Sequence, residues 1–160
     1  SVFENVRCSV LWSLGYRYSF WHLVSTAREV QERTEMVLEQ LNLTARRNVP
    51  AGVLAYAEQR ALEIGITIAG GADVILLDEP TAGMSRSETE HVVQLVRQVS
   101  AGKTLLMVEH DMSVVFDLAD RIAVLVYGQV IAHDTPERIR ANAAVQEAYL
   151  GVAQTATASC

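Results

Sequence analysis

An apolar run that ends in two adjacent acids constrains the fold of this chain more than any other feature. Four consecutive apolar residues, 74–77, are followed by Asp78, Glu79 and Pro80. Such a run is typical of a strand buried on both faces of a parallel sheet, and it delivers the next residues to the carboxyl edge, where open α/β folds bind ligands. Two acids at that edge are costly unless a cation meets them, and a magnesium ion carrying a nucleotide polyphosphate is the commonest reason. The alternative is a solvated acidic turn, since Asp-Glu-Pro is also ordinary turn chemistry.

Composition narrows the class of protein. The chain has 160 residues, of which 50% are hydrophobic and 20% charged, enough for one globular domain. The net charge of -6 argues against a nucleic-acid-binding face. Two cysteines are too few for a disulfide framework or a metal cluster, and we expect Cys8 to be a small core residue. The apolar stretch 10–24 is too short and too polar to span a bilayer, so we expect any membrane connection to come through a partner protein.

Hydrophobic spacing predicts alternating helices and strands. Helices are expected over 2–14, 25–43, 58–69, 87–99 and 112–118, strands over 74–77 and 104–108, and a hairpin over 122–132 that turns at Gly128. Two short helices are expected near 136–142 and 144–150, followed by a frayed end from 154. This order predicts an α/β fold with a parallel sheet flanked by helices. The aromatic cluster at 16–23 is expected to pack internally, with a partner-binding patch as the alternative.

Three groups of chemically capable residues stand next to the predicted strands. Residues 54–60 (Leu-Ala-Tyr-Ala-Glu-Gln-Arg) open the helix before the apolar strand, residues 78–80 follow that strand, and Glu109, His110 and Asp111 follow the next one. Each group lies at a helix start or at a strand's carboxyl end, so we expect all three to share one edge of the sheet. His110 alone would more often be a buried histidine bonded to backbone, but its neighbours favour a ligand contact.

Taken together, these motifs resemble those of the nucleotide-binding subunits of ATP-binding-cassette transporters, in the branch that serves branched-chain amino-acid importers. Residues 54–60 correspond to the signature motif, 75–80 (ILLDEP) to Walker B, His110 to the switch histidine and 82–85 to the D-loop, while 145–151 are similar to the branch's C-terminal extension. The resemblance covers about residues 1–151. It implies part of a P-loop NTPase fold, with a helical subdomain and signature helix over 1–69, a Walker B and switch core with a hairpin over 70–134, a helical extension over 135–151 and a flexible tail over 152–160.

The resemblance also implies a role for each matched residue. Asp78 would hold Mg²⁺ through a coordinated water, Glu79 would deprotonate the attacking water as general base, and His110 would contact the γ-phosphate of ATP. The signature segment would present a helix N-terminus to the ATP of a partner subunit. The implied nucleotide-binding residues are Ala55, Tyr56, Ala57, Glu58, Gln59 and Ser85.

The sequence departs from the family pattern in two places of the signature and in one missing motif. Ala55 removes a hydroxyl donor, and Ala57 stands where glycine would let the backbone approach a phosphate or adopt a positive φ. Gly102-Lys103-Thr104 does not supply a Walker A loop, because Arg97 occupies the position of the first glycine and the segment lies between a helix and a strand. The resemblance therefore implies the C-terminal portion of a longer subunit, and we expect the isolated chain not to hydrolyse ATP.

The function implied by the resemblance is that of an ATP-binding subunit that couples ATP hydrolysis to uptake of branched-chain amino acids. Its partners would be a second ATP-binding subunit, a membrane permease touched by residues 2–43 and, indirectly, a periplasmic or extracellular substrate-binding protein, without nucleic acid. The permease would hold it at the cytoplasmic face of the membrane. The alternatives are a urea-type importer, a non-hydrolysing interaction-only fragment, and a DNA-repair ATPase, which the acidic charge and the lack of long heptads oppose.

Overall fold

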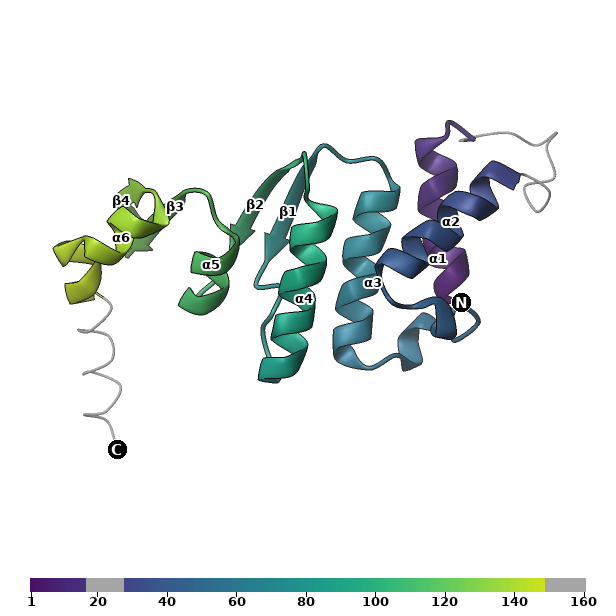
Figure 1. Cartoon of the computed structure of the whole chain (residues 1–160), viewed down its shortest axis with the longest axis horizontal. Helices are drawn as coiled ribbons and strands as arrows, with labels where there is room; N and C mark the ends of the chain where they lie inside the picture. The colour runs from purple at the N-terminus through teal and green to yellow at the C-terminus, as the bar shows by residue number, and fades with distance from the viewer. Residues whose placement is uncertain (17–27, 149–160) are drawn as a thin grey trace. The chain divides into compact units, whose positions relative to one another are not determined.

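The structure, a computed structural model, describes residues 1–16 and 28–148 (Figure 1). They belong to two compact units, residues 1–109 and residues 110–160. The first unit contains α1 (Val2–Ser13), α2 (Arg28–Gln40), η2 (Thr44–Arg46), η3 (Ala51–Val53), α3 (Tyr56–Ala69), β1 (Val74–Asp78), α4 (Arg86–Val99) and β2 (Thr104–Val108). The second contains α5 (Met112–Leu118), β3 (Ile122–Val126), β4 (Gln129–Asp134) and α6 (Pro136–Ala141), and residues 143–148 are also helical. The four-part division implied by the resemblance stays a prediction.

The predicted helices and strands are confirmed, with shifts at some ends. The first helix stops at Ser13, and Gly15 follows with a φ of 82°, a left-handed conformation that glycine adopts without strain. The third helix starts at Tyr56, two residues before the predicted start at 58. The start predicted for the second helix, the aromatic cluster beyond Tyr16 and the predicted frayed end lie outside the described residues.

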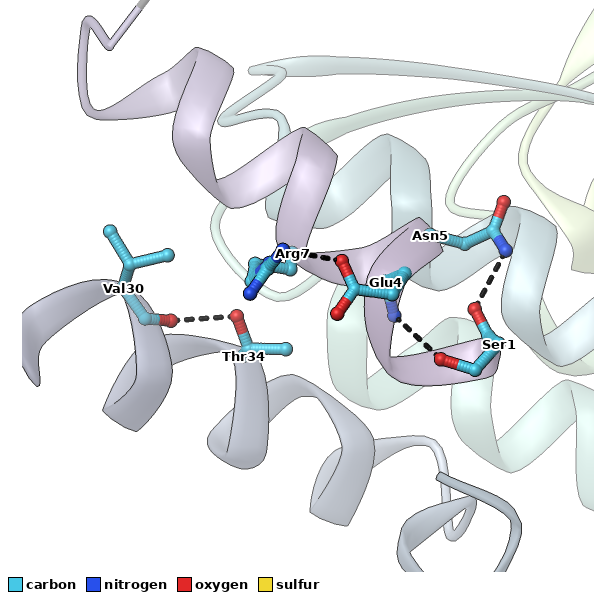
Figure 2. Close-up of polar contacts among 6 residues, drawn as sticks. All are labelled: Ser1, Glu4, Asn5, Arg7, Val30 and Thr34. Carbon is cyan, nitrogen blue, oxygen red and sulfur yellow. Dashed lines mark hydrogen bonds and ion pairs between the residues drawn. The ribbon is translucent and has the colours of Figure 1, made fainter. Parts of the chain in front are cut away.

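A serine cap sets the beginning of α1. The Ser1 hydroxyl accepts a hydrogen bond from the Glu4 backbone N–H at 3.3 Å, and the Ser1 carbonyl accepts one from the Asn5 side-chain amide at 2.8 Å (Figure 2). Glu4 also forms an ion pair with Arg7 at 2.6 Å. The first of these contacts satisfies the Glu4 N–H, which has no partner within the helix, and the negative charge of Glu4 in the first turn interacts favourably with the positive end of the helix dipole.

A hydrophobic core forms between α1, α2 and α3, which pack against one another. The buried positions recur every four residues, as the helical period requires, and are Val2, Val6 and Val10 on α1 with Val30, Thr34 and Leu38 on α2. Thr34 is polar yet fully buried, and its hydroxyl donates to the Val30 carbonyl at 2.6 Å (Figure 2). That bond lets a hydroxyl lie in the core without an unmade hydrogen bond.

Cys8 does not belong to this core, so the expectation for it is wrong. Its side chain is exposed, whereas Val6 and Val10 are buried. Two residues along a helix correspond to a rotation of about 200°, which places Cys8 on the opposite side from both valines. No helix in the described part of the chain has the length and apolar character needed to cross a membrane.

Gly65 lies where α3 meets the buried side chain of Leu41. A Cβ atom at position 65 would collide with Leu41 Cδ1 and would lie 2.9 Å from Cδ2. We expect Gly65→Ala to lower the free energy of unfolding by about 1–2 kcal/mol, because an overpacking cost of about 2–3 kcal/mol outweighs the roughly 1 kcal/mol that alanine gains over glycine in a helix. Urea denaturation measures this, with Gly52→Ala as control, since a Cβ at position 52 meets nothing within 4 Å. Equal midpoints for the two variants would contradict the prediction.

The predicted strand–helix–strand unit is present as a parallel pair. β1 and β2 run side by side with Asp78 opposite Val108, and α4 connects them and lies alongside them (Figure 1). The strand is not buried on both faces, however, so that expectation is wrong. Ile75 is 1% exposed, whereas Leu76 is 70% exposed. In the described unit the face that carries Ile75 is covered and the face that carries Leu76 is open, whereas a parallel strand needs helices on both faces for full burial.

The second unit is organised around the predicted hairpin. β3 and β4 pair antiparallel in a sheet of their own, instead of adding a third strand to the parallel pair. Tyr127 and Gly128 form the turn with φ values of 48° and 76°, as the tight two-residue turns that join antiparallel strands require. A small core of Ile122, Ile139 and Val145 covers one side of this hairpin.

Candidate functional site

The carboxyl end of β1 carries the two predicted acids. Asp78 is the last residue of the strand, and Glu79 follows it; both are exposed. The Glu79 N–H donates to the Val108 carbonyl at 2.9 Å, so the backbone pairing with β2 continues one residue beyond the strand. Glu79 has a φ of 43°, which lies in the left-handed region and is uncommon for any residue other than glycine.

A second contact between the ends of the two strands was not anticipated. Thr81 is 7% exposed, and both its N–H and its hydroxyl donate to one carboxylate oxygen of Glu109, the N–H at 3.2 Å. Glu109 belongs to the third group of chemically capable residues, but the sequence predicts no role for it or for Thr81. A threonine directly after Asp-Glu-Pro and an acid directly after the next strand were the available signals.

Ser85 is the N-cap residue of α4 and lies at the end of this loop. Its N–H and its hydroxyl donate to Glu88 Oε2 at 2.9 Å and 2.5 Å. The side-chain hydrogen bond from Ser85, followed by the backbone one, lowers the pKa of the Glu88 carboxyl below its ordinary value. Between Glu79 and Ser85 the chain folds back through two turns, in which Ala82 N–H donates to Glu79 O and Met84 N–H to Thr81 O. In this structure the Ser85 hydroxyl therefore serves the helix start.

The predicted signature segment starts α3 with Ala55 at the cap position. Alanine has no side-chain acceptor, so the first turn is supported by Glu58, whose Oε2 accepts from the Ala55 N–H at 3.1 Å. The other oxygen of Glu58 pairs with Arg46 at 2.9 Å. The hydrogen bond from Arg46 is the main cause that lowers the pKa of Glu58. Gln59 donates from its side-chain amide to the Leu54 carbonyl at 3.0 Å.

Ala57 lies in the first turn of α3 and has no positive φ. Its backbone conformation therefore does not require glycine, and its methyl group is half-buried. The expected effect of that methyl group on the approach of a phosphate stays a prediction. Tyr56, before it, is 48% exposed and carries the Arg60 guanidinium at 5.6 Å from its ring centroid. The helix start thus presents backbone N–H groups, an aromatic face and a cation.

His110 is the first residue of the second unit and is exposed. The next residue, Asp111, caps α5 by accepting hydrogen bonds from the Ser113 N–H at 2.8 Å and the Ser113 hydroxyl at 2.6 Å. The Ser113 side-chain bond is the main reason that the pKa of Asp111 is lowered. The structure thus brings Asp78, Glu79, Thr81 and Glu109 together at the ends of the parallel strands, whereas Ala55 to Gln59 are held by contacts of their own.

The donor set at the strand end suits magnesium better than metals that need several protein ligands. Within residues 1–16 and 28–148, no group of three or more His, Cys, Asp or Glu side chains is arranged for a metal ion. Magnesium usually binds through one or two carboxylates together with water and substrate phosphates. The exposed carboxylate of Asp78 fits that mode. Two surface hollows lie beside α2, and both are lined by Met36 and Glu39. Neither is lined by the residues that follow β1.

Comparisons with known proteins agree with these motifs. A family model described as "Branched-chain amino acid ATP-binding cassette transporter" matches residues 129–154. The high-affinity branched-chain amino acid transport ATP-binding protein BraF of Pseudomonas aeruginosa is 41% identical over 128 residues, which are 79% of this chain and 50% of BraF. LivG of Escherichia coli, described in the same words, is 39% identical over 127 residues, 78% of this chain and 50% of LivG.

The chain belongs to the ATP-binding-cassette (ABC) family. It spans about half the length of the curated relatives that it matches. Among solved structures, an ATP-binding cassette of an ABC transporter, MJ1267 in its ADP conformation, matches with a TM-score of 0.74 and 26% identity over 94% of this chain and 63% of that one. The ABC cassette MJ0796, a dimer bound to ADP and phosphate, matches with a TM-score of 0.67 and 25% identity over 85% of this chain and 56% of that one.

Proposed function

We propose that this chain forms part of the ATP-binding subunit of an importer and couples ATP hydrolysis to the uptake of branched-chain amino acids. The observation that carries the proposal is the Asp78-Glu79 pair at the carboxyl end of a parallel strand, in an ABC chain that is 41% identical to BraF over 79% of its length. ABC relatives of this branch support the choice of cargo over the urea-type alternative.

Each predicted catalytic or metal-binding residue has its own role in ATP hydrolysis. Asp78 would hold Mg²⁺, as the family resemblance implies for this position, and the bound ion would supply positive charge to the phosphates. Glu79 accepts a proton from the water that attacks the γ-phosphate. His110 donates a hydrogen bond to that phosphate and so reports its presence. Phosphoryl transfer depends mainly on such positioning and charge stabilisation, and each of these groups supplies one or the other.

The start of α3 acts on the nucleotide of a second ATP-binding subunit. The N–H groups of Tyr56, Ala57 and Glu58, together with the helix dipole, form an anion site, and Ala55, Gln59 and Ser85 lie in the matching nucleotide-binding motifs. The ion pair between Glu58 and Arg46 keeps the Glu58 carboxylate occupied, which lessens its repulsion of a phosphate. The match to a dimeric cassette supports the two-subunit arrangement.

The remaining partners follow from the importer assignment. Residues 2–43 contact a membrane permease, which holds the subunit at the cytoplasmic face of the membrane, and a substrate-binding protein on the far side delivers the amino acid to the permease. The helices α1 and α2 support this contact region, because they pack on α3, the helix that starts with the signature motif. A cross-linking experiment in an assembled transporter that leaves 2–43 unmodified would contradict the permease contact.

The isolated chain is inactive, because it has no phosphate-binding Walker A loop. Calorimetry with magnesium and ATP tests this and the proposed function together, comparing residues 1–160 with a chimaera that adds the N-terminal half of BraF. We expect binding heat with the chimaera and none with residues 1–160. Tight binding by residues 1–160 would reveal a different nucleotide site, and a folded chimaera that does not bind would refute the proposed function.

A further inference from the structure

Glu109 lies where it can control the backbone that carries Glu79. One of its carboxylate oxygens accepts hydrogen bonds from both the N–H and the hydroxyl of Thr81, two positions after Glu79. Thr81 is 7% exposed and Glu109 is half-buried, so these bonds are partly shielded from bulk water. Hydrogen bonds to an ionised group are roughly twice as strong as neutral ones, and a low local dielectric strengthens them further. A single side chain at the end of β2 thus fixes both the backbone and the side chain of Thr81.

The backbone of Glu79 needs such support. Its φ of 43° lies in the left-handed region, which is sterically unfavourable for a residue with a Cβ. It also precedes Pro80, and a proline favours an extended backbone in the residue before it. Residues in sparsely populated conformations persist only where the surrounding structure holds them, and they cluster at functional sites.

The support comes from the end of β2. Val108 accepts the Glu79 N–H at 2.9 Å, and Glu109 holds Thr81 on the other side of Pro80. The Glu79 carbonyl in turn accepts the Ala82 N–H at 3.1 Å. Val108 and Glu109 are consecutive residues at the end of β2. Their hydrogen bonds therefore hold the loop on both sides of the Glu79–Pro80 bond.

We propose that Glu109 is a positioning residue for the reaction: through Thr81 it holds Glu79 in the left-handed backbone conformation from which its carboxylate acts. The role of Glu79 as general base rests on the proposed function, whereas the clamp between Glu109 and Thr81 is a property of this chain. Glu109 does not touch the reacting atoms in this scheme. Its effect reaches them through the backbone of residues 79–81.

Amide hydrogen exchange, measured by NMR on residues 1–160, tests the clamp without any nucleotide. In Glu109→Ala we expect the Thr81 amide to exchange about tenfold faster or more, because a charge-assisted hydrogen bond is lost. The Glu79 amide should also exchange faster, while the amides of α1 and α3 keep their rates. An unchanged rate at Thr81 would overturn the proposal.

If Glu109→Ala does not fold, two substitutions of Thr81 test the same hydrogen bonds from the other partner. Thr81→Ser keeps both donors and should leave exchange at positions 79 and 81 as in the unsubstituted chain. Thr81→Val keeps the shape and the N–H but removes the hydroxyl, and should raise exchange at both positions. Equal rates in the two variants would overturn the clamp.

The rate of ATP hydrolysis distinguishes a positioning role of Glu109 from a purely structural one. In the chimaera that completes the subunit, Glu109→Ala should lower kcat for ATP hydrolysis about tenfold or more, because small misplacements of reacting groups are costly, and should leave KM for ATP within about twofold. Glu109→Gln keeps an acceptor oxygen and should retain more of kcat. An unchanged kcat in a variant whose Thr81 amide is released would overturn the positioning role. If the unsubstituted chimaera hydrolyses no ATP, the proposed function fails and the exchange rates alone decide the clamp.

Discussion

Glu79→Gln is expected to slow ATP hydrolysis by the completed subunit about 100- to 10,000-fold, the usual contribution of a positioned general base. Glutamine has nearly the same size but cannot accept the proton of the attacking water. Binding of magnesium and ATP should be retained, because the substitution leaves Asp78 in place. Steady-state phosphate release and calorimetry on the chimaera with the N-terminal half of BraF measure the two effects separately.

The matched control for this substitution is Glu90→Gln. Glu90 lies on the exposed side of α4, where it pairs with Arg86 at 3.2 Å, and its loss should leave hydrolysis unchanged. Residues 1–160 alone provide a second control, since we expect no phosphate release above that of their own Glu79→Gln form. Clear release by residues 1–160 above that level, or full activity of Glu79→Gln in the chimaera, would contradict the assignment of the general base.

The second large effect is expected at adjacent residues of β1 that face opposite sides of the sheet. Ile75→Ala should lower the free energy of unfolding by about 2–5 kcal/mol, because Ile75 is 1% exposed and its removal leaves a cavity. Leu76→Ala should change it by no more than about 0.5 kcal/mol, because the Leu76 side chain is 70% exposed. Urea denaturation of residues 1–160 measures both.

The comparison between the two variants tests the open face of the parallel pair. Val74, Leu106 and Val108 are each more than half exposed on β1 and β2, like Leu76. If Leu76→Ala destabilised the chain as much as Ile75→Ala, this face would be covered in solution, and the loss should then depend on protein concentration. A loss that is small and independent of concentration confirms the exposed face.

Local patterns were sufficient for most secondary structure. The spacing of apolar residues predicted α4 within one residue at its start, and the run 74–77 predicted β1. Gly128 marked the hairpin turn correctly, because two-residue turns need left-handed backbone there. Cys8 was misplaced because a residue type that is usually buried was given more weight than its angular position between Val6 and Val10.

The candidate site also contains features that the sequence predicts and features that only the structure shows. Asp78, Glu79 and His110 stand out in the sequence as polar residues at or just after the ends of strands, and the roles that the family resemblance implies for them stay predictions. The contact between Thr81 and Glu109 was not predicted, because the two residues are 28 positions apart and only the parallel register of β1 and β2 brings them within hydrogen-bonding distance. Sequence spacing carries no signal for a contact of this kind.

Periodicity and residue types within a few positions are enough to predict the helices and strands, the ABC motifs and the acids at the strand end. The tertiary structure decided which face of β1 is buried, that Ala57 needs no glycine conformation, and that Glu79 has a left-handed backbone supported by Val108 and Glu109. Those properties arise from contacts between segments far apart in the chain, and they exist only when the two strands are paired.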